Sequence, residues 1–176
     1  MFASPTTWNT ARLTLRRPTP EDAQAIFTAY ASDPEATRYM SWLVHRSIED
    51  TRGFISFANQ EWNECGVGAY LIQLDSAVIG STGLHLAAPH RAVIGYILSR
   101  QLWGHGYATE ACTAMVELGR SLRLERVEAQ CHADHVASAR VLEKSGMIFE
   151  GVLRKHSLFP NLSPLPQDVR SYAWTS

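Results

Sequence analysis

The sequence predicts an α/β protein of the α+β kind, one domain over residues 1–176 with a mixed, mostly antiparallel sheet of about seven strands and four helices. Three observations predict this fold. The 176 residues suffice for one hydrophobic core. A content of 45% hydrophobic and 19% charged residues is typical of globular proteins. Strand-like and helix-like segments alternate, and the short connections between the central strands favour antiparallel hairpins.

The first three elements follow from alternation and capping signals. Leucines alternate with polar residues in the first element, as in a half-buried strand, and prolines follow it. Acidic residues in a first turn favour the first helix, and Ser47 with Asp50 three residues on favours the second. These elements are a strand Arg12–Arg17, a helix from Thr19 or Pro20 to near Pro34, and a helix from Ser47 towards Trp62.

The remaining elements begin after glycines 66 and 68, where the pattern changes to strands. One apolar stripe predicts a surface helix packed on the sheet, and three prolines in Phe159–Gln167 predict a stiff surface loop. The expected elements are strands Ala69–Leu74, Ala77–Leu86 and Ala92–Leu98, helix Ala108–Ser121, strand Arg126–Cys131, helix Val136–Ser145, and strands Met147–Leu153 and Val169–Trp174.

Charge and cysteine content exclude several classes of function. A formal net charge of -1 does not favour a nucleic-acid partner. Three cysteines, odd in number and far apart, fit neither a disulfide framework nor a zinc site, so we expect a cytoplasmic protein without a bound metal. Residues 1–10 lack a targeting signal, and no apolar run approaches the roughly 18 residues of a membrane helix, so we expect no membrane partner.

The most informative segment is the loop Gln101–Ala108, between a strand and a helix. Gly104 and Gly106 allow a tight turn with unobstructed N–H groups. The helix that follows adds the positive end of its dipole. The loop therefore predicts a site for a phosphate or pyrophosphate.

Two nucleotide-binding motifs fit this loop poorly. A dinucleotide fingerprint needs a third glycine where Thr109 stands, and it belongs in an early parallel β-α-β unit. The phosphate loop of ATP and GTP enzymes needs a lysine followed by serine or threonine, where this chain has Tyr107 and Ala108. The first motif is disfavoured and the second is excluded.

A third signature, Gln/Arg-x-x-Gly-x-Gly/Ala, fits the loop. With it the chain resembles the GNAT superfamily of N-acetyltransferases that use acetyl-coenzyme A (acetyl-CoA), and in particular its Rim-type branch, which acetylates ribosomal-protein alanine N-termini. The similarity spans nearly the whole chain. It rests on residues 12–16 (RLTLR), 33–39 (DPEATRY), 79–84 (IGSTGL), 95–96 (GY), 107–111 (YATEA) and 137–146 (ASARVLEKSG).

The resemblance implies a GNAT-like sheet that splays between its fourth and fifth strands, Ala92–Leu98 and Arg126–Cys131. The pantetheine arm of acetyl-CoA would lie in this gap. A backbone N–H near Ile97 or Leu98 would stabilise the oxyanion. The residues expected to hold the donor are Ile97, Leu98, Gln101, Trp103, Gly104, His105, Gly106, Tyr107, Ala108, Thr109, His135 and Ser138.

Proton transfer residues follow less directly from the resemblance. Many GNAT members use a tyrosine to protonate the thiolate, but Leu142 stands there, so Ser138 is the candidate, with an ordinary helix-surface serine as the alternative. His135 replaces the usual capping asparagine, and Asp134 could cap the helix in its place.

Three residues are candidates for the general base. His85 lies on a strand leading to the site, and a histidine titrates near physiological pH, although a non-catalytic histidine is the competing interpretation. Glu110 and Glu150 are rivals that could equally form salt bridges or caps. An α-amine is about 10 to 20% neutral at physiological pH, against about 0.1% for lysine. A weak base therefore favours an N-terminal acceptor.

We therefore expect acetyl transfer to a primary amine, first of all a protein N-terminus, by a monomer or homodimer. The alternatives are a small amine, such as a polyamine, amino acid or antibiotic, and a non-catalytic acyl-CoA-binding module. Cys112 is expected in the core rather than as a nucleophile. Tyr39 and Trp42 line the acceptor entrance or pack in the core, and Phe159–Gln167 covers the acceptor site or is a passive loop.

Overall fold

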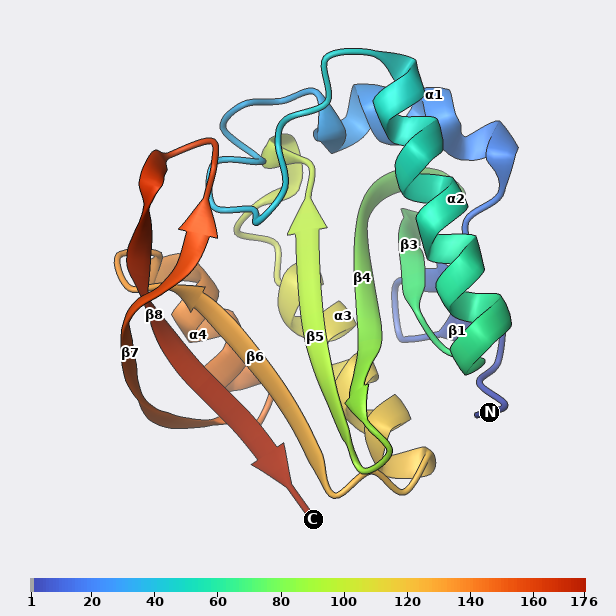
Figure 1. Cartoon of the computed structure of the whole chain (residues 1–176). Coiled ribbons are helices and arrows are strands. Elements are labelled where there is room, and N and C mark those ends of the chain that lie inside the picture. Colours follow the sequence, from blue (N-terminus) through green and yellow to red (C-terminus); the bar gives the residue numbers. More distant parts are fainter. Residues whose placement is uncertain (1) are drawn as a thin grey trace.

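A twisted eight-stranded sheet forms the centre of the computed structural model, which describes residues 2–176 (Figure 1). The strand order is β1-β2-β3-β4-β5-β6-β8-β7, and every neighbouring pair is antiparallel except β5 and β6. The strands are β1 Thr7–Asn9, β2 Thr14–Arg16, β3 Ala69–Leu74, β4 Ala77–Ala88, β5 Arg91–Leu98, β6 Arg126–His132, β7 Ile148–Phe159 and β8 Ser163–Thr175.

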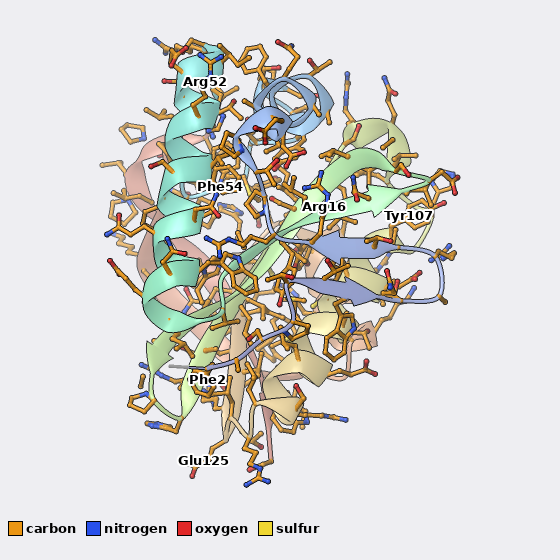
Figure 2. The ribbon with its side chains drawn as sticks, turned by 90° about the vertical axis from the view of Figure 1, so that its right-hand side faces the viewer. Phe2, Arg16, Arg52, Phe54, Tyr107 and Glu125 are labelled. Atoms are coloured by element: carbon orange, nitrogen blue, oxygen red, sulfur yellow. The ribbon has the colours of Figure 1, made fainter. Side chains whose placement is uncertain are left out.

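Helices cover both faces of this sheet, with α1 and α2 on one face and α3 and α4 on the other (Figures 1 and 2). The expected Ser47–Asp50 capping box begins α2, and Gly66, with φ of 76°, ends it. The helices are α1 Ala23–Ile26, extended by a 3-10 turn Pro20–Asp22 and a π turn Phe27–Ala31, then α2 Ile48–Cys65, α3 Tyr107–Ser121 and α4 Val136–Lys144. Within residues 2–176, none of these helices combines the length and apolarity needed to cross a membrane.

The expected fold class is confirmed, with two differences in the strands. A short strand, β1, precedes the first one expected and raises the number to eight. The segment Phe159–Gln167 is a β-hairpin tip rather than a loop, because β7 continues to Phe159 and β8 begins at Ser163. Prolines are tolerated there because this part of β8 pairs with β7 alone, while β6 pairs with β8 only from Val169 onward.

The sheet splays between β5 and β6, as expected. Their parallel pairing covers only Arg91–Val93 against residues 126–128. β5 then continues to Leu98, and β6 to His132, without further pairing to each other. The gap opens towards the same end of β5 at which the loop before α3 begins (Figure 1).

Candidate active site

The glycine loop has the backbone conformation that the sequence predicts. Gly104 and Gly106 have φ of 81° and 82°, in the left-handed region that disfavours side chains, and Gly106 is the N-cap of α3. A Cβ added at Gly104 would meet no atom within 4 Å. The loop therefore presents an open surface at the positive end of α3, which suits a pyrophosphate.

Arg12, in the turn between β1 and β2, adds a cation beside this loop. Its guanidinium donates to the Glu110 carboxylate at 2.7 Å and to the His105 carbonyl at 3.1 Å, and it lies 4.5 Å from the centre of the Tyr107 ring. A Cβ at Gly106 would be 3.5 Å from the same guanidinium. Figure 2 shows Tyr107 at the edge of the molecule near this turn. No sequence pattern predicts this contact, because Arg12 stands only at the start of an expected strand.

Other side chains of the loop fold back on the protein. Trp103 donates its indole N–H to the Leu98 carbonyl at 3.0 Å, and the His105 ring stacks on Tyr107 with centroids 5.9 Å apart. Gln101 lines a cavity of about 390 Å³ on the α1 side. Ala108 and Thr109 lie in the first turn of α3.

Backbone groups of β5 alternate between β4 and the gap. The Ile97 carbonyl faces β4, because a Cβ added at Gly80 would lie 2.2 Å from its oxygen. The Leu98 carbonyl points away from β4 and accepts from Trp103. Since the N–H and C=O of one strand residue point to the same neighbour in an antiparallel pair, the Leu98 and Tyr96 amides face the gap and the Ile97 amide does not. Of the two amides expected near the acetyl group, that of Leu98 is directed into the gap and that of Ile97 is not.

Ser138 lies on α4 opposite β5, where Tyr96 meets it. Its hydroxyl is 2.7 Å from the Tyr96 hydroxyl, which also lies 3.2 Å from the Ser138 carbonyl. Burial raises the pKa of Tyr96. Burial likewise raises the pKa of Cys131, against an opposing hydrogen bond with Ser138. The Gly95–Tyr96 pair belongs to the resemblance, but nothing in the sequence indicates that Tyr96 reaches Ser138.

Neither predicted cap closes the N-terminus of α4. His135 is the N-cap residue but makes no side-chain capping bond, and the exposed Asp134 carboxylate points to the His132 ring at 4.0 Å. Capping by Asp134 is therefore wrong. The His135 ring instead stacks on Tyr39 at 4.4 Å, and burial, followed by the charge of His132, lowers its pKa.

The three candidate bases have different partners. His85 Nδ1 lies 2.8 Å from the Glu61 carboxylate of α2. Glu110 binds Arg12 and Thr10; burial acts to raise its pKa, but these hydrogen bonds outweigh burial and lower it. Glu150 pairs with Arg126, whose hydrogen bond lowers the Glu150 pKa. Both glutamates are paired with arginines and His85 is paired with a carboxylate, so the general base stays a prediction.

Cys112 is a small core residue, as expected. It is fully buried, and burial raises the pKa of its thiol to about 11. A nucleophilic thiolate needs a lowered pKa and exposure, so this side chain is inert. Among residues 2–176, no group of three His, Cys, Asp or Glu side chains is placed to hold a metal ion.

The loop between α1 and α2 is tied to the β7–β8 hairpin tip by Asn161. Its amide donates to the carbonyls of Thr37 and Trp42 at 2.9 and 2.8 Å, and its oxygen accepts from the Val44 N–H at 2.9 Å. Tyr39 of this loop packs on the histidines at the end of β6. The two segments expected around the acceptor therefore meet at the open end of the splay.

The glycine-rich turn before α3 lies beside the gap between two parallel strands. Residues 12–148 match the Acetyltransferase (GNAT) domain family. The chain belongs to this family. It is an N-acetyltransferase that transfers the acetyl group of acetyl-CoA.

Curated relatives align over most of their length. The chain is 38% identical over 167 residues to an uncharacterized N-acetyltransferase, YoaA, of Bacillus subtilis, covering 92% of this chain and 93% of that protein. It is 34% identical over 152 residues to the uncharacterized N-acetyltransferase p20 of Bacillus licheniformis, covering 84% and 85%. Both relatives are N-acetyltransferases without a stated acceptor.

Solved structures share the fold over nearly the whole chain. A GNAT-family acetyltransferase from Bacillus anthracis has a TM-score of 0.83 at 27% identity, covering 96% of this chain and 98% of that one. The microcin C7 self-immunity acetyltransferase MccE, solved with acetyl-CoA and AMP, has 0.84 at 22%, covering 95% and 94%. RimL, a ribosomal L7/L12 α-N-protein acetyltransferase solved with coenzyme A, has 0.83 at 22%, covering 97% and 96%.

Proposed function

We propose that this GNAT enzyme acetylates the N-terminal α-amine of a protein. The observation that carries the proposal is the charge pairing on the face covered by α1 and α2. Two carboxylates at this face are held by arginine side chains: Asp33 by Arg100, and Glu128 by Arg91 and Arg126. A polyamine or aminoglycoside carries several positive charges and needs unpaired carboxylates. A single α-amine does not.

The chain fits the donor that its family uses. The Gly104 and Gly106 amides, the start of α3 and the Arg12 guanidinium offer an anion site for a pyrophosphate. Acetyl-CoA supplies the acetyl group as a thioester. The Leu98 N–H would donate to the thioester oxygen as its charge develops. Ser138 would give its proton to the departing sulfur and regain one from solvent, while the neutral amine would lose one proton to His85, which releases it to solvent.

The cytoplasm is the expected compartment for this reaction, because all three cysteines are free and the transfer needs no oxidant. RimL, which acts on a protein α-amine by its description, shares the fold and supports the choice of acceptor by analogy only.

Thiol release from acetyl-CoA tests the acceptor. The panel pairs each peptide that has a free N-terminus and one lysine with its N-formylated form, in which the lysine is the remaining amine. Spermidine and an aminoglycoside complete the panel. We expect release only with free N-termini. Preferred turnover of spermidine or the aminoglycoside would overturn the acceptor assignment, and tight acetyl-CoA binding without release across the panel would identify a non-catalytic acyl-CoA-binding module.

A further inference from the structure

A polar groove lies between α2 and the first two strands, on the side of the molecule that Figure 2 shows. It is a cavity of about 1060 Å³, lined by one face of α2 from Arg52 to Glu64 and, opposite that face, by residues 6–7 and 16–20. At 1.5 Å per residue, this face of the helix is about 18 Å long. The residues that line the groove include none of the glycine loop, so it is separate from the donor site.

Arg17, the residue after β2, enters this groove and is fixed there by uncharged groups. Its Nε donates to Asn59 Oδ1 at 2.6 Å, and its Nη2 donates to Asn63 Oδ1 at 2.8 Å and to the Asn59 carbonyl at 3.2 Å. The guanidinium also lies 5.6 Å from the centre of the Trp62 ring. Within residues 2–176, no carboxylate pairs with it within 4 Å. The protein therefore leaves this positive charge without a counterion.

The head of Arg17 is oriented before any ligand binds. Asn59 presents its oxygen to Arg17 because its amide nitrogen donates to the carbonyls of Pro18 and Ile55, each at 3.1 Å. The three hydrogen bonds of the guanidinium use three of its five N–H groups and leave both Nη1 hydrogens. Nη1 is not among the buried unpartnered atoms of the described residues, so it is open to solvent in the groove. A ligand would meet a cation whose side-chain entropy is already lost.

The other two arginines of the groove are neutralised. Arg16 donates to both carboxylate oxygens of Asp22, at 2.8 and 2.6 Å. Arg52 pairs with Glu49, one turn before it on α2. Arg17 is thus the uncompensated cation of this groove, and one positive charge is complementary to a ligand group with one negative charge.

The charges along the groove favour a carboxylate over a phosphate. Glu64, at the far end, accepts from the uncharged Gln60 amide at 2.8 Å. This carboxylate would repel a phosphate dianion more strongly than a monoanion. A single carboxylate matches the one cation and would form a charge-assisted hydrogen bond with Arg17 Nη1.

The strand opposite α2 favours a peptide as the bearer of that carboxylate. β1 is the outermost strand of the sheet. Because the Arg17 N–H donates to the Thr6 carbonyl at 2.9 Å, the next residue, Thr7, directs its own N–H and carbonyl away from β2. Unpaired groups of an edge strand can bind an extended peptide. At about 3.3 Å per residue, the roughly 18 Å of groove holds about five residues of extended chain.

We propose that this groove binds an extended acidic peptide segment, whose carboxylate accepts a hydrogen bond from Arg17 Nη1. Asn59 and Asn63 are the positioning residues that hold the guanidinium. The site lies apart from the donor site, so the inference goes beyond acetyl transfer and does not depend on the acceptor proposed above.

The test is titration calorimetry with a five-residue peptide that has a central glutamate, compared with the same peptide carrying glutamine. Both peptides are acetylated and amidated at their ends, so that neither has an α-amine to be acetylated. We expect the glutamate peptide to bind roughly 10- to 100-fold more tightly, the range for one hydrogen bond to a charged group. Arg17→Gln should remove this preference. Equal binding of the two peptides, no binding of either, or an unchanged preference in Arg17→Gln would overturn the proposal.

Control variants separate the site from general attraction and from folding. Arg52→Gln is the matched control, because Arg52 lines the same groove but is paired with Glu49, and it should keep the preference. A loss equal to that of Arg17→Gln would show long-range attraction instead of a site. Arg17→Gln should also keep the coenzyme A affinity and Tm of the wild type.

Two further arms cover a loss of folding and a different ligand. If Tm falls in Arg17→Gln, Asn63→Ala provides the test, because it removes one bond that orients the guanidinium and leaves the charge. It should weaken the preference for the glutamate peptide without removing it, and an unchanged preference would refute the positioning role. Free glutarate bound as tightly as the peptide would overturn the assignment of a peptide ligand.

Discussion

The hydroxyl of Tyr96 on β5 lies 2.7 Å from that of Ser138 on α4, so one hydrogen bond spans the gap through which the pantetheine arm would pass. Both side chains are partly buried. Tyr96 therefore holds the Ser138 hydroxyl from its protein side. In the proposed reaction, the other side of that hydroxyl would face the sulfur.

Removing these hydroxyls should slow turnover to different degrees. Ser138→Ala should lower kcat by roughly 100-fold, because it removes the proton donor itself. Tyr96→Phe should lower kcat by about 5- to 10-fold, since one hydrogen bond contributes ~1 kcal/mol. Tyr70→Phe is the control, because Tyr70 donates to the Pro5 carbonyl at 2.7 Å from a different strand. Unchanged kcat in Ser138→Ala would refute the assignment of the acid.

Gly106→Val should abolish coenzyme A binding while the protein stays folded. The side chain would occupy the anion site, and the left-handed conformation would be strained by about 1 to 2 kcal/mol. Titration calorimetry with coenzyme A measures the affinity, and Tm measures folding. Gly53→Ala, at an uncrowded position within α2, is the control. An affinity within threefold of wild type in Gly106→Val would show that the pyrophosphate lies elsewhere.

Asn161→Ala should raise KM for the acceptor with little change in coenzyme A affinity. The three hydrogen bonds that tie residues 37–44 to the hairpin are lost, at a cost of about 1–3 kcal/mol in unfolding free energy. Asn161→Asp keeps the acceptor for the Val44 N–H and loses both donated bonds. Its KM for the acceptor should therefore lie between the values of the wild type and of Asn161→Ala. If acceptor KM is the same in all three proteins, this loop does not shape the acceptor site.

The free energy of unfolding should decrease at acid pH, partly because Glu110 becomes protonated. Its pKa is lowered in the folded protein, so its contribution is complete above the ordinary carboxyl value of about 4.3 and is lost as pH falls through the folded value. Urea unfolding between pH 3 and 7 measures this slope. In Glu110→Gln the slope below about pH 4.3 should be shallower, whereas an unchanged slope would place the linkage on other carboxylates.

Local sequence patterns predicted much of this structure. The capping box at Ser47 and the glycines of the loop predict conformations that depend on neighbouring residues only, and both are present. The β-hairpin over Phe159–Gln167 was predicted as a loop because prolines disfavour strands, except in strands at the edge of a sheet. Contacts between distant segments, such as Arg12 with Glu110, leave no periodic trace in a single sequence.

The short pairing of β5 with β6 has a further consequence for the energetics of the molecule. Two blocks of sheet, β1–β5 and β6–β8, share only three residue pairs along their seam. A donor lying in that seam would replace the absent strand contacts, and binding confined to the native state raises thermal resistance by mass action. A cosubstrate bound there would connect the two blocks as an additional strand does, and amide hydrogen exchange at Tyr96 and Leu98 would measure how much it stabilises their contact.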